Sequence, residues 1–342
     1  MKKIIFRIPF AFTLVYYVLF CVSFLFIFNK NQSNLTFVVG GKGWILERIC
    51  KEIKACFRGN SLLHYSTRSI PKSNTYFFSL YREYLTAAVR NPYIFLGNIY
   101  VFYTHYTPGP FSKRDLARVL NLVKKIFVVN SKDRDFLIEI GVNPKKIKVV
   151  FLGVNEKLFL PSKNIESAQK TIGFCLRYEN WGDYTYRKNH GKIIDLVKAL
   201  DSYQVILLGY RWENYERFSE IKSLKHFKYV ETDYSNYQDY YKQMDVFVSV
   251  SRVEGAPMPL LEAMFCNVFP VVSDTGFARD LIKPGKNGLI FETEASVQEI
   301  LKLIQQATAV QEKVNVRSTV EHLTWKNFGE KIVNSMAGNK SV

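Results

Sequence analysis

Short apolar runs, each followed by a glycine or polar turn and a helix-forming stretch, recur along the chain. Near the start, residues 35–39 are predicted to form a strand, residues 40–43 a glycine turn and residues 44–57 a helix. A strand, a glycine loop and a helix in this order are typical of the opening of a Rossmann-like half. Two further apolar runs, residues 93–96 and 99–103, are also predicted to be strands.

The same alternation continues to the end of the chain. The remaining predicted strands are residues 126–131 (ending at a helix cap), 171–176, 205–209, 229–233, 246–250 and 267–274. Helices are predicted over residues 192–200 and 325–336, and a glycine turn at residues 285–288 precedes the last apolar run. Strands alternating with helices predict an α/β protein with parallel sheets.

The most informative segment is the stretch of residues 251–264, in which a loop turns into a helix that carries Glu254 and Glu262. Pro259 suits the first helical turn, where a missing N–H costs nothing. The unpaired amides and positive end of such a helix form a site for a diphosphate. The available N–H donors are those of Gly255, Ala256, Met258, Leu260 and Leu261. We expect Glu254 at the sugar end of a nucleotide sugar and Glu262 near its ribose diol; a capped surface helix with two solvated glutamates is the alternative.

This segment, with the strand and glycine turn that follow it, resembles the C-terminal half of a family 4 retaining glycosyltransferase of the GT-B fold. The resemblance rests on the pattern Glu-Gly-x-Pro-x-x-Leu-Leu-Glu-Ala-Met and covers most of residues 35–336. Asn267 stands where a Gly is usual, Asp280 where a Glu is usual, and Pro257 where many members have Gly. The resemblance implies two Rossmann-like domains that face a central cleft.

The resemblance also implies how the chain is divided. Residues 1–33 are expected to be a hydrophobic membrane anchor and linker, 34–160 the acceptor-binding domain, 161–325 the nucleotide-sugar-binding domain, and 326–342 a helix that crosses back to the first domain. Retention of the anomeric configuration is implied only by the resemblance. Neither half shows an acid/base pair at a defined spacing, so the residues themselves do not establish the stereochemistry.

Four residues outside this motif match functional positions of the family. Arg177, after a strand, and Lys188, before a helix, match the cations that clamp the donor diphosphate. His105 follows a strand end, where ligands bind in open α/β sheets, and matches the histidine that contacts the transferred sugar. Gly41 matches a loop that approaches the donor phosphates. Surface cations and a structural histidine are the alternatives.

Residues 8–28 form a run of 21 residues without a charge, about 31 Å long as a helix, which matches the hydrocarbon core of a bilayer. No small-residue cleavage site follows it, so an uncleaved anchor is predicted, with a buried first helix as the alternative. The preceding cations mildly favour a catalytic part outside the cytoplasm. Because nucleotide sugars are cytoplasmic in bacteria, we expect a membrane-associated enzyme with cytoplasmic catalytic domains.

The net charge of +17 is concentrated in the first half of the chain. Residues 1–160 hold 24 Lys and Arg against 8 Asp and Glu, whereas residues 161–342 hold 23 against 22. Such a field attracts acidic phospholipid, a diphosphate-linked acceptor or nucleic acid. No zinc knuckle, helix-turn-helix or RNP-type strand favours nucleic acid. Five cysteines without a C-x-x-C pair indicate a reducing compartment.

Together these features predict a hexosyltransferase that moves a sugar from a nucleotide-diphosphate sugar to a lipid-linked or polysaccharide acceptor in cell-surface glycan biosynthesis. No metal or other cofactor is expected. Asp133-Arg-Asp135 imitates a metal-binding D-x-D signature, but it lies at a helix start, where acids are favoured in any case. The alternatives are a catalytically silent protein that binds nucleotide sugar or glycan, and a sugar-nucleotide epimerase.

Overall fold

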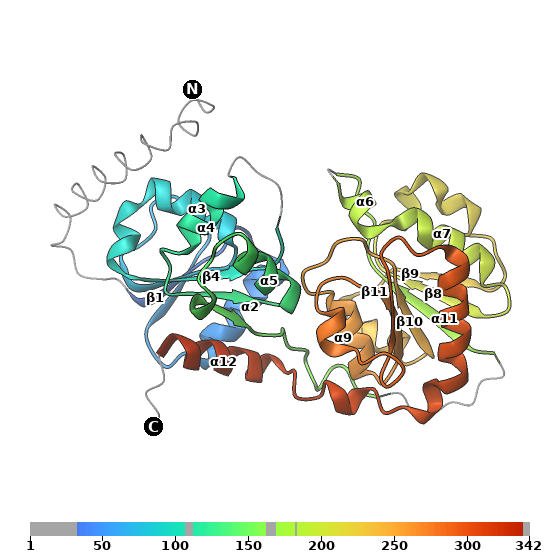
Figure 1. Cartoon of the computed structure of the whole chain (residues 1–342). Coiled ribbons are helices and arrows are strands. Elements are labelled where there is room, and N and C mark those ends of the chain that lie inside the picture. Colours follow the sequence, from blue (N-terminus) through green and yellow to red (C-terminus); the bar gives the residue numbers. More distant parts are fainter. Residues whose placement is uncertain (1–32, 107–111, 162–168, 182, 338–342) are drawn as a thin grey trace. The chain divides into compact units, whose positions relative to one another are not determined.

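The computed structural model describes residues 33–106, 112–161, 169–181 and 183–337. The chain divides into two compact units (Figure 1). The first unit comprises the chain up to Phe151 together with the segment from Trp325, and the second comprises Leu152–Thr324. Each unit is built on its own parallel six-stranded sheet, so the predicted α/β architecture with two Rossmann-like halves is confirmed.

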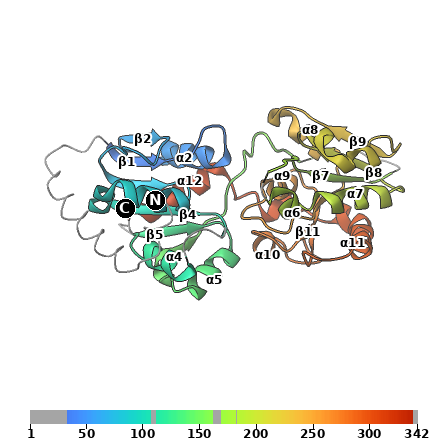
Figure 2. The same ribbon diagram turned by 90° about the horizontal axis from the view of Figure 1, so that it is seen from above.

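The sheet of the first unit has the strand order β2-β1-β3-β4-β5-β6. Figure 2 labels β2, β1, β4 and β5 of this sheet. Its strands are β1 (Ser33–Val38), β2 (Ser61–His64), β3 (Ser73–Phe78), β4 (Asn98–Tyr103), β5 (Lys125–Val128) and β6 (Ile147–Val149). The helices are α2 (Ile45–Cys56), α3 (Tyr81–Arg90), α4 (Lys113–Leu120), α5 (Ser131–Glu139) and α12 (Trp325–Ala337), with short 3-10 turns η1 (Pro92–Leu96) and η2 (Pro144–Lys146).

The sheet of the first unit is buried on both faces. Along β4, Val101 and Tyr103 face the core formed with α3, α4 and α5, whereas Phe102 faces the opposite way and meets Phe328 of α12 edge-on. Side chains alternate between the two faces of a strand, which explains this division. Because all three β4 side chains are fully buried, β4 reads as an unbroken apolar run.

Helix α12, at the end of the chain, belongs to the first unit and packs on α2. The guanidinium of Arg48 lies 4.8 Å from the centre of the Trp325 ring, and the hydroxyl of Tyr100 donates to the carbonyl of Met336 at 2.9 Å. The predicted helix over residues 325–336 is thereby confirmed, and its apolar stripe covers one face of the first sheet.

The sheet of the second unit has the order β12-β11-β10-β7-β8-β9. Its strands are β7 (Thr171–Cys175), β8 (Gln204–Leu208), β9 (Phe227–Val230), β10 (Val246–Ser249), β11 (Phe269–Ser273) and β12 (Leu289–Phe291). Its helices are α6 (Tyr184–Lys188), α7 (His190–Ala199), α8 (Tyr237–Tyr241), α9 (Met258–Phe265), α10 (Ala278–Leu281) and α11 (Val297–Val310), with 3-10 turns at Trp212–Asn214, Glu216–Glu220, Tyr234–Asn236, Gln311–Lys313 and Arg317–Thr319. All six strands end at one edge, which places the segments after β7, β10 and β11 side by side.

The predicted strand over residues 93–96 is wrong, because this run forms the 3-10 turn η1. Pro92 occupies its first position, where a fixed φ favours a turn of helix, and Ile94 inserts into the core. The side chain of Asn91 accepts the Ile70 N–H at 3.2 Å and fixes the start of the turn. The strand next to β4 is instead β3, in a region for which the apolar pattern predicted no element.

The chain enters the second unit at Leu152, earlier than the predicted boundary near Pro161. Val154 forms an isolated parallel bridge with Thr324, and its N–H donates to the Leu323 carbonyl at 2.9 Å. Phe159 packs against the rings of Tyr234 and Tyr241. The segment from Leu152 to Phe159 therefore folds as part of the second unit.

The predicted anchor over residues 8–28 lies outside the described residues. Within the described part of the chain, no helix combines the length and the apolar character needed to cross a bilayer.

Candidate active site

A pocket of about 180 Å³ opens in the second unit at the carboxyl ends of β7 and β10. Two sheet strands, the end of α6 and the start of α9 form its walls. The polar side chains that line it are those of Arg177, Tyr184, Lys188, Ser249, Ser251 and Glu254. The structure thus brings together, in one place, both predicted diphosphate cations and the predicted sugar carboxylate.

Helix α9 points its first turn into this pocket. It begins at Met258, with Pro257 as the residue before it and Pro259 in the first turn, as the sequence predicted. Prolines at these positions remove amides that the first turn leaves unpaired in any case. The N–H of Leu260 donates to the Pro257 carbonyl at 3.0 Å, so the prediction that it is available to a ligand is wrong.

The loop before α9 supplies the other predicted amides. Among the described residues, no acceptor is placed at the N–H groups of Ala256 and Met258. Pro259 and Leu260 line the pocket beside them. Unpaired amides at a helix start favour a bound anion. The roles predicted for these amides, and for those of Gly255 and Leu261, remain predictions.

Lys188 and Glu254 form an ion pair within the pocket. The ammonium lies 2.5 Å from the Glu254 carboxylate, and the two side chains are only 18% and 11% exposed. Lys188 ends the short helix α6, and Asn189 follows in a left-handed conformation with φ 56°. The side chain of Asn189 donates to the Val250 carbonyl at 3.2 Å. This bond ties the segment bearing Lys188 to the strand end that leads to Glu254.

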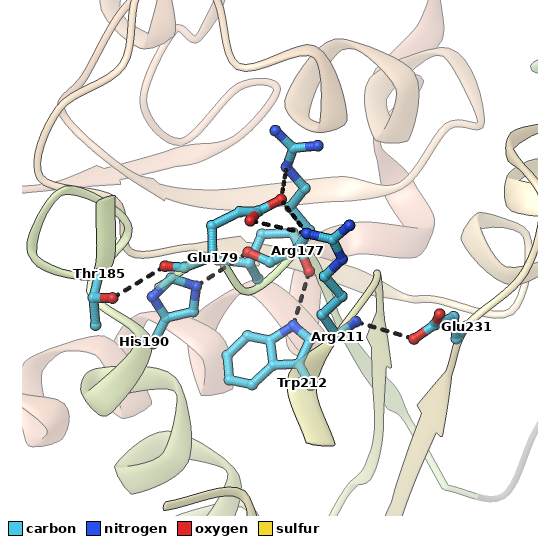
Figure 3. Close-up of polar contacts among 8 residues, drawn as sticks. Arg177, Glu179, Thr185, His190, Arg211, Trp212 and Glu231 are labelled. Atoms are coloured by element: carbon cyan, nitrogen blue, oxygen red, sulfur yellow. Dashed lines mark hydrogen bonds and ion pairs between the residues drawn. The ribbon is translucent and has the colours of Figure 1, made fainter. Parts of the chain in front are cut away.

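Arg177 is held by a network that the sequence did not reveal. The carboxylate of Glu179, 13% exposed, lies 3.4 Å from the Arg177 guanidinium and 3.1 Å from that of Arg211 (Figure 3). Two cations thus share one carboxylate, which leaves net positive charge beside the pocket. Glu179 lies two residues after Arg177, but nothing in the local pattern marks it as a partner.

The backbone beneath Arg177 is fixed by two buried aromatic rings. The Trp212 indole donates to the Leu176 carbonyl at 2.8 Å, and His190 Nε2 lies 3.1 Å from the Arg177 carbonyl (Figure 3). Burial lowers the pKa of His190, whose ring packs against Tyr178 and Trp212. His190 is therefore neutral and donates to the carbonyl. No setting for this histidine was visible in the sequence.

Glu262 is buried and already hydrogen-bonded. Its two oxygens accept the hydroxyls of Tyr234 at 2.5 Å and Tyr241 at 3.0 Å. Tyr241 is fully buried, whereas Tyr234 is 40% exposed. Glu262 therefore differs from the solvated carboxylate of the alternative interpretation. A ribose diol would meet it on the side where Tyr234 reaches solvent.

The candidates in the first unit lie at the carboxyl edge of its own sheet. His105 is half-buried just after β4, and Gly41 lies exposed between β1 and α2. A side chain at Gly41 would meet open space, whereas a Cβ at Gly40 would lie 2.1 Å from Glu83 Oε1. A side chain at Gly40 would therefore displace the Glu83 carboxylate. The roles predicted for His105 and Gly41 remain predictions.

Glu83 lies beneath this glycine turn. Its carboxylate accepts the Ser79 hydroxyl at 2.6 Å and the N–H of Gly40, while burial raises its pKa to about 7. The unfolded chain ionises this group near 4.5, so between these pH values the native state binds more protons than the unfolded state. Stability contributed by Glu83 therefore falls as pH rises from 4.5 through 7.

Replacing Glu83 by Gln is expected to remove this loss of stability at higher pH. The glutamine amide oxygen still accepts the N–H of Gly40, but it carries no charge. Chemical denaturation should show the variant to be more stable than wild type by up to about 3 kcal/mol at pH 8 and by less than about 1 kcal/mol at pH 5. The comparison at pH 5 is the internal control. An equal difference at both pH values would show that ionisation of Glu83 is not the cause.

The sequence Asp133-Arg-Asp135, which imitates a D-x-D signature, lies at the start of helix α5. Asn130 Oδ1 accepts the Asp133 N–H at 2.7 Å, and the Asn130 amide donates back to the Asp133 carboxylate. Burial raises the pKa of Asp133 to about 7, which disfavours a charged metal ligand there. Within the described ranges, no group of three or more His, Cys, Asp or Glu side chains is placed to hold a metal ion.

Comparison with known proteins gives independent information on the second unit. Residues 180–318 match the family model of glycosyl transferases group 1. This stretch includes Lys188, Glu254 and helix α9, but not Arg177. No curated protein sequence matches the chain.

Solved structures resemble most of the chain. HepE from Anabaena, solved with UDP-glucose, is 15% identical with a TM-score of 0.68, covering 90% of this chain and 100% of its own. The lipopolysaccharide outer core galactosyltransferase WaaB is 15% identical with a TM-score of 0.68 (89% and 99% covered). A glycosyltransferase from Rickettsia africae is 16% identical with a TM-score of 0.65 (91% and 100% covered). The fold is thus GT-B-like, and the family match over the second unit supports a glycosyltransferase.

Proposed function

We propose that the chain transfers a sugar, with retention of configuration, from a nucleoside-diphosphate sugar to a lipid-linked or polysaccharide acceptor. The observation that supports this most directly is the pocket in which Arg177, Lys188, Glu254 and the start of α9 converge. Residues 8–28 associate the protein with a membrane, and the two folded units act on its cytoplasmic side. As in family 4 enzymes, the second unit holds the donor and the basic first unit the acceptor.

The chemistry requires stabilisation of the departing diphosphate. Arg177, Lys188 and the positive end of α9 all supply positive charge to the pocket, which lowers the barrier electrostatically without reorganisation at the moment of reaction. Glu254 and His105 orient the transferred sugar. Orientation and charge stabilisation together account for glycosyl transfer without a metal ion in this proposal.

The ion pair between Lys188 and Glu254 gives the site a resting arrangement. Before donor binds, the Lys188 ammonium and the Glu254 carboxylate neutralise each other's charge in a partly buried position. An incoming diphosphate attracts Lys188 and releases Glu254 toward the sugar hydroxyls. The pair therefore keeps both groups in place while limiting the cost of burying them unpaired.

Incubation of purified full-length protein with a panel of nucleotide sugars tests the proposal. UDP-glucose, the ligand in the HepE structure, is the first donor to try. We expect slow donor hydrolysis without acceptor and faster transfer when lipid-linked or polysaccharide acceptors are added. Binding without any turnover would favour the silent binding protein, and conversion to an isomeric nucleotide sugar would favour the epimerase.

Glu262 provides a specific test of donor binding. Glu262→Gln is expected to raise the KM for donor about tenfold, because hydrogen bonds to a charged acceptor contribute about 1.5–3 kcal/mol. Tyr234→Phe frees one Glu262 oxygen and should leave this KM unchanged or lower it. Initial-rate kinetics over a range of donor concentrations distinguish the two. A higher KM in both variants would indicate that Glu262 only supports the fold.

A further inference from the structure

The parallel sheet of the first unit has two chemically different edges. At the carboxyl edge, charges of both signs are mixed: the first helical turns carry Glu47, Glu83, Asp115 and Asp133, and also Arg48, Arg82, Lys113, Arg114, Lys132 and Arg134. The chain returns to the amino edge through residues 57–60, 65–72, 91–97, 121–124 and 140–146. These five segments contain Arg58, Arg68, Lys72, Lys124, Lys145 and Lys146, but no Asp or Glu. Glu139, the last residue of α5, is an acidic side chain beside them, so the amino edge carries an excess of cations over anions.

Part of this charge has a local explanation. Cations such as Lys54 and Arg90 lie in last helical turns, where they stabilise the negative ends of α2 and α3. Lys124, Lys125 and Lys145 lie outside the α-helices. Among the described residues, none of these three ammonium groups has an ion-pair partner. Neither a helix end nor an ion pair therefore accounts for the positive charges of these three lysines.

Exposed apolar side chains accompany these lysines. They are Val89, Leu96, Leu122 and Ile138, which are 40%, 52%, 54% and 38% exposed. Hydrogen bonds hold the segments that carry them together. The Asn121 amide donates to the Gly141 carbonyl at 2.9 Å, and the Lys124 N–H donates to the Ile99 carbonyl at 2.8 Å. We call these four side chains, with Lys124, Lys125 and Lys145, the basic edge surface.

Strand β1, which follows the uncharged run of residues 8–28 in the sequence, begins at this same edge. Residue 33 begins β1, which pairs with β3 from Ser33 opposite Ser73. In the strand order, β1 and β5 are three strand spacings apart, roughly 14 Å. Only residues 29–32 separate the apolar run from β1. The first residue of β1, five residues after the predicted anchor in the sequence, therefore lies at the edge that carries the basic edge surface.

We propose that the basic edge surface lies against an anionic phospholipid bilayer when residues 8–28 are embedded in it. This inference rests on the membrane association in the proposed function and adds an orientation to it. Lysines attract acidic headgroups, and exposed leucine and isoleucine side chains enter the headgroup boundary. The carboxyl edge of the same sheet, with His105, then faces away from the lipid.

Hydrogen exchange of the full-length protein in lipid nanodiscs tests the orientation. Residues 89–96, 121–125 and 138–146 are expected to exchange severalfold more slowly in discs containing phosphatidylglycerol than in discs of phosphatidylcholine alone. Replacing Lys124, Lys125 and Lys145 by Gln should abolish the difference, since each lysine near an anionic surface changes binding roughly fivefold. High salt should have the same effect.

The matched control replaces Lys222, Lys225 and Lys286 by Gln. These lysines are exposed in the second unit, so the control changes the net charge equally and should keep the protection. Equal exchange in both kinds of disc would overturn the proposal, as would the same protection in lipid-free protein at high concentration or with duplex DNA. Donor hydrolysis in detergent should be unchanged in both triple variants, which separates failure of this inference from failure of the proposed function.

Discussion

Replacing Lys188 by Ala is expected to lower the rate of sugar transfer by about a hundredfold to a thousandfold, and Glu254→Gln is expected to do the same. These magnitudes are typical of removing one preorganised group that stabilises developing charge. In the proposed function Lys188 stabilises the leaving diphosphate and Glu254 orients the sugar, and both side chains line the same pocket. Steady-state transfer assays with saturating donor measure the effect. Near-wild-type turnover by both variants would refute these roles.

Stability has to be separated from activity in this experiment. Lys188→Ala leaves a Glu254 carboxylate, 11% exposed, without its cation, which costs about 1–3 kcal/mol. The double variant Lys188→Ala with Glu254→Ala removes both charges and should recover part of the stability but none of the activity. Lys198→Ala is the matched control, because Lys198 forms an exposed ion pair with Glu220 at 2.9 Å, outside the pocket.

Replacing Gly209 by Ala is expected to destabilise the second unit by more than about 3 kcal/mol. Gly209 has φ 153°, a conformation that side chains rarely adopt, and an added Cβ would lie 1.8 Å from the Leu176 carbonyl oxygen. This carbonyl also accepts the Trp212 indole N–H. The clash therefore displaces the backbone that positions Arg177. Thermal unfolding and donor binding should be affected together.

Gly285→Ala provides the control for this prediction. Gly285 also has a positive φ, 77°, but an added Cβ would meet open space. Its substitution should cost only about 1–2 kcal/mol and leave donor binding intact. If the two alanine variants were equally stable, contact between β8 and Leu176 would not constrain the site.

Much of the fold follows from the sequence because apolar runs of the right length are buried by any parallel sheet. The predicted strands over residues 99–103 and 171–176 correspond to β4 and β7. Helix α9 begins where Pro259 indicated. The exception at residues 93–96 shows the limit. A run of four apolar residues is compatible with a strand and with a buried turn. Here Pro92 and the hydrogen bond from the Ile70 N–H to the Asn91 side chain favour the turn.

The candidate site shows the same limit for polar residues. Arg177, Lys188 and Glu254 are recognisable because each stands beside a strand end or helix start. The residues that contact them cannot be recognised in this way. Glu179, His190 and Tyr241 acquire their places only when β7, α7 and α8 pack around the sheet edge.

The sequence by itself determined the alternation of strands and helices, the glycine turns and the helix start at Pro259, because these depend on local conformational preferences and on the period of apolar residues. Only the tertiary structure decided that Lys188 pairs with Glu254, that Tyr234 and Tyr241 donate hydrogen bonds to Glu262, and that Lys124, Lys125 and Lys145 lie at one sheet edge. Such contacts join residues far apart in the chain, and their energies depend on distance and burial, which no local pattern specifies.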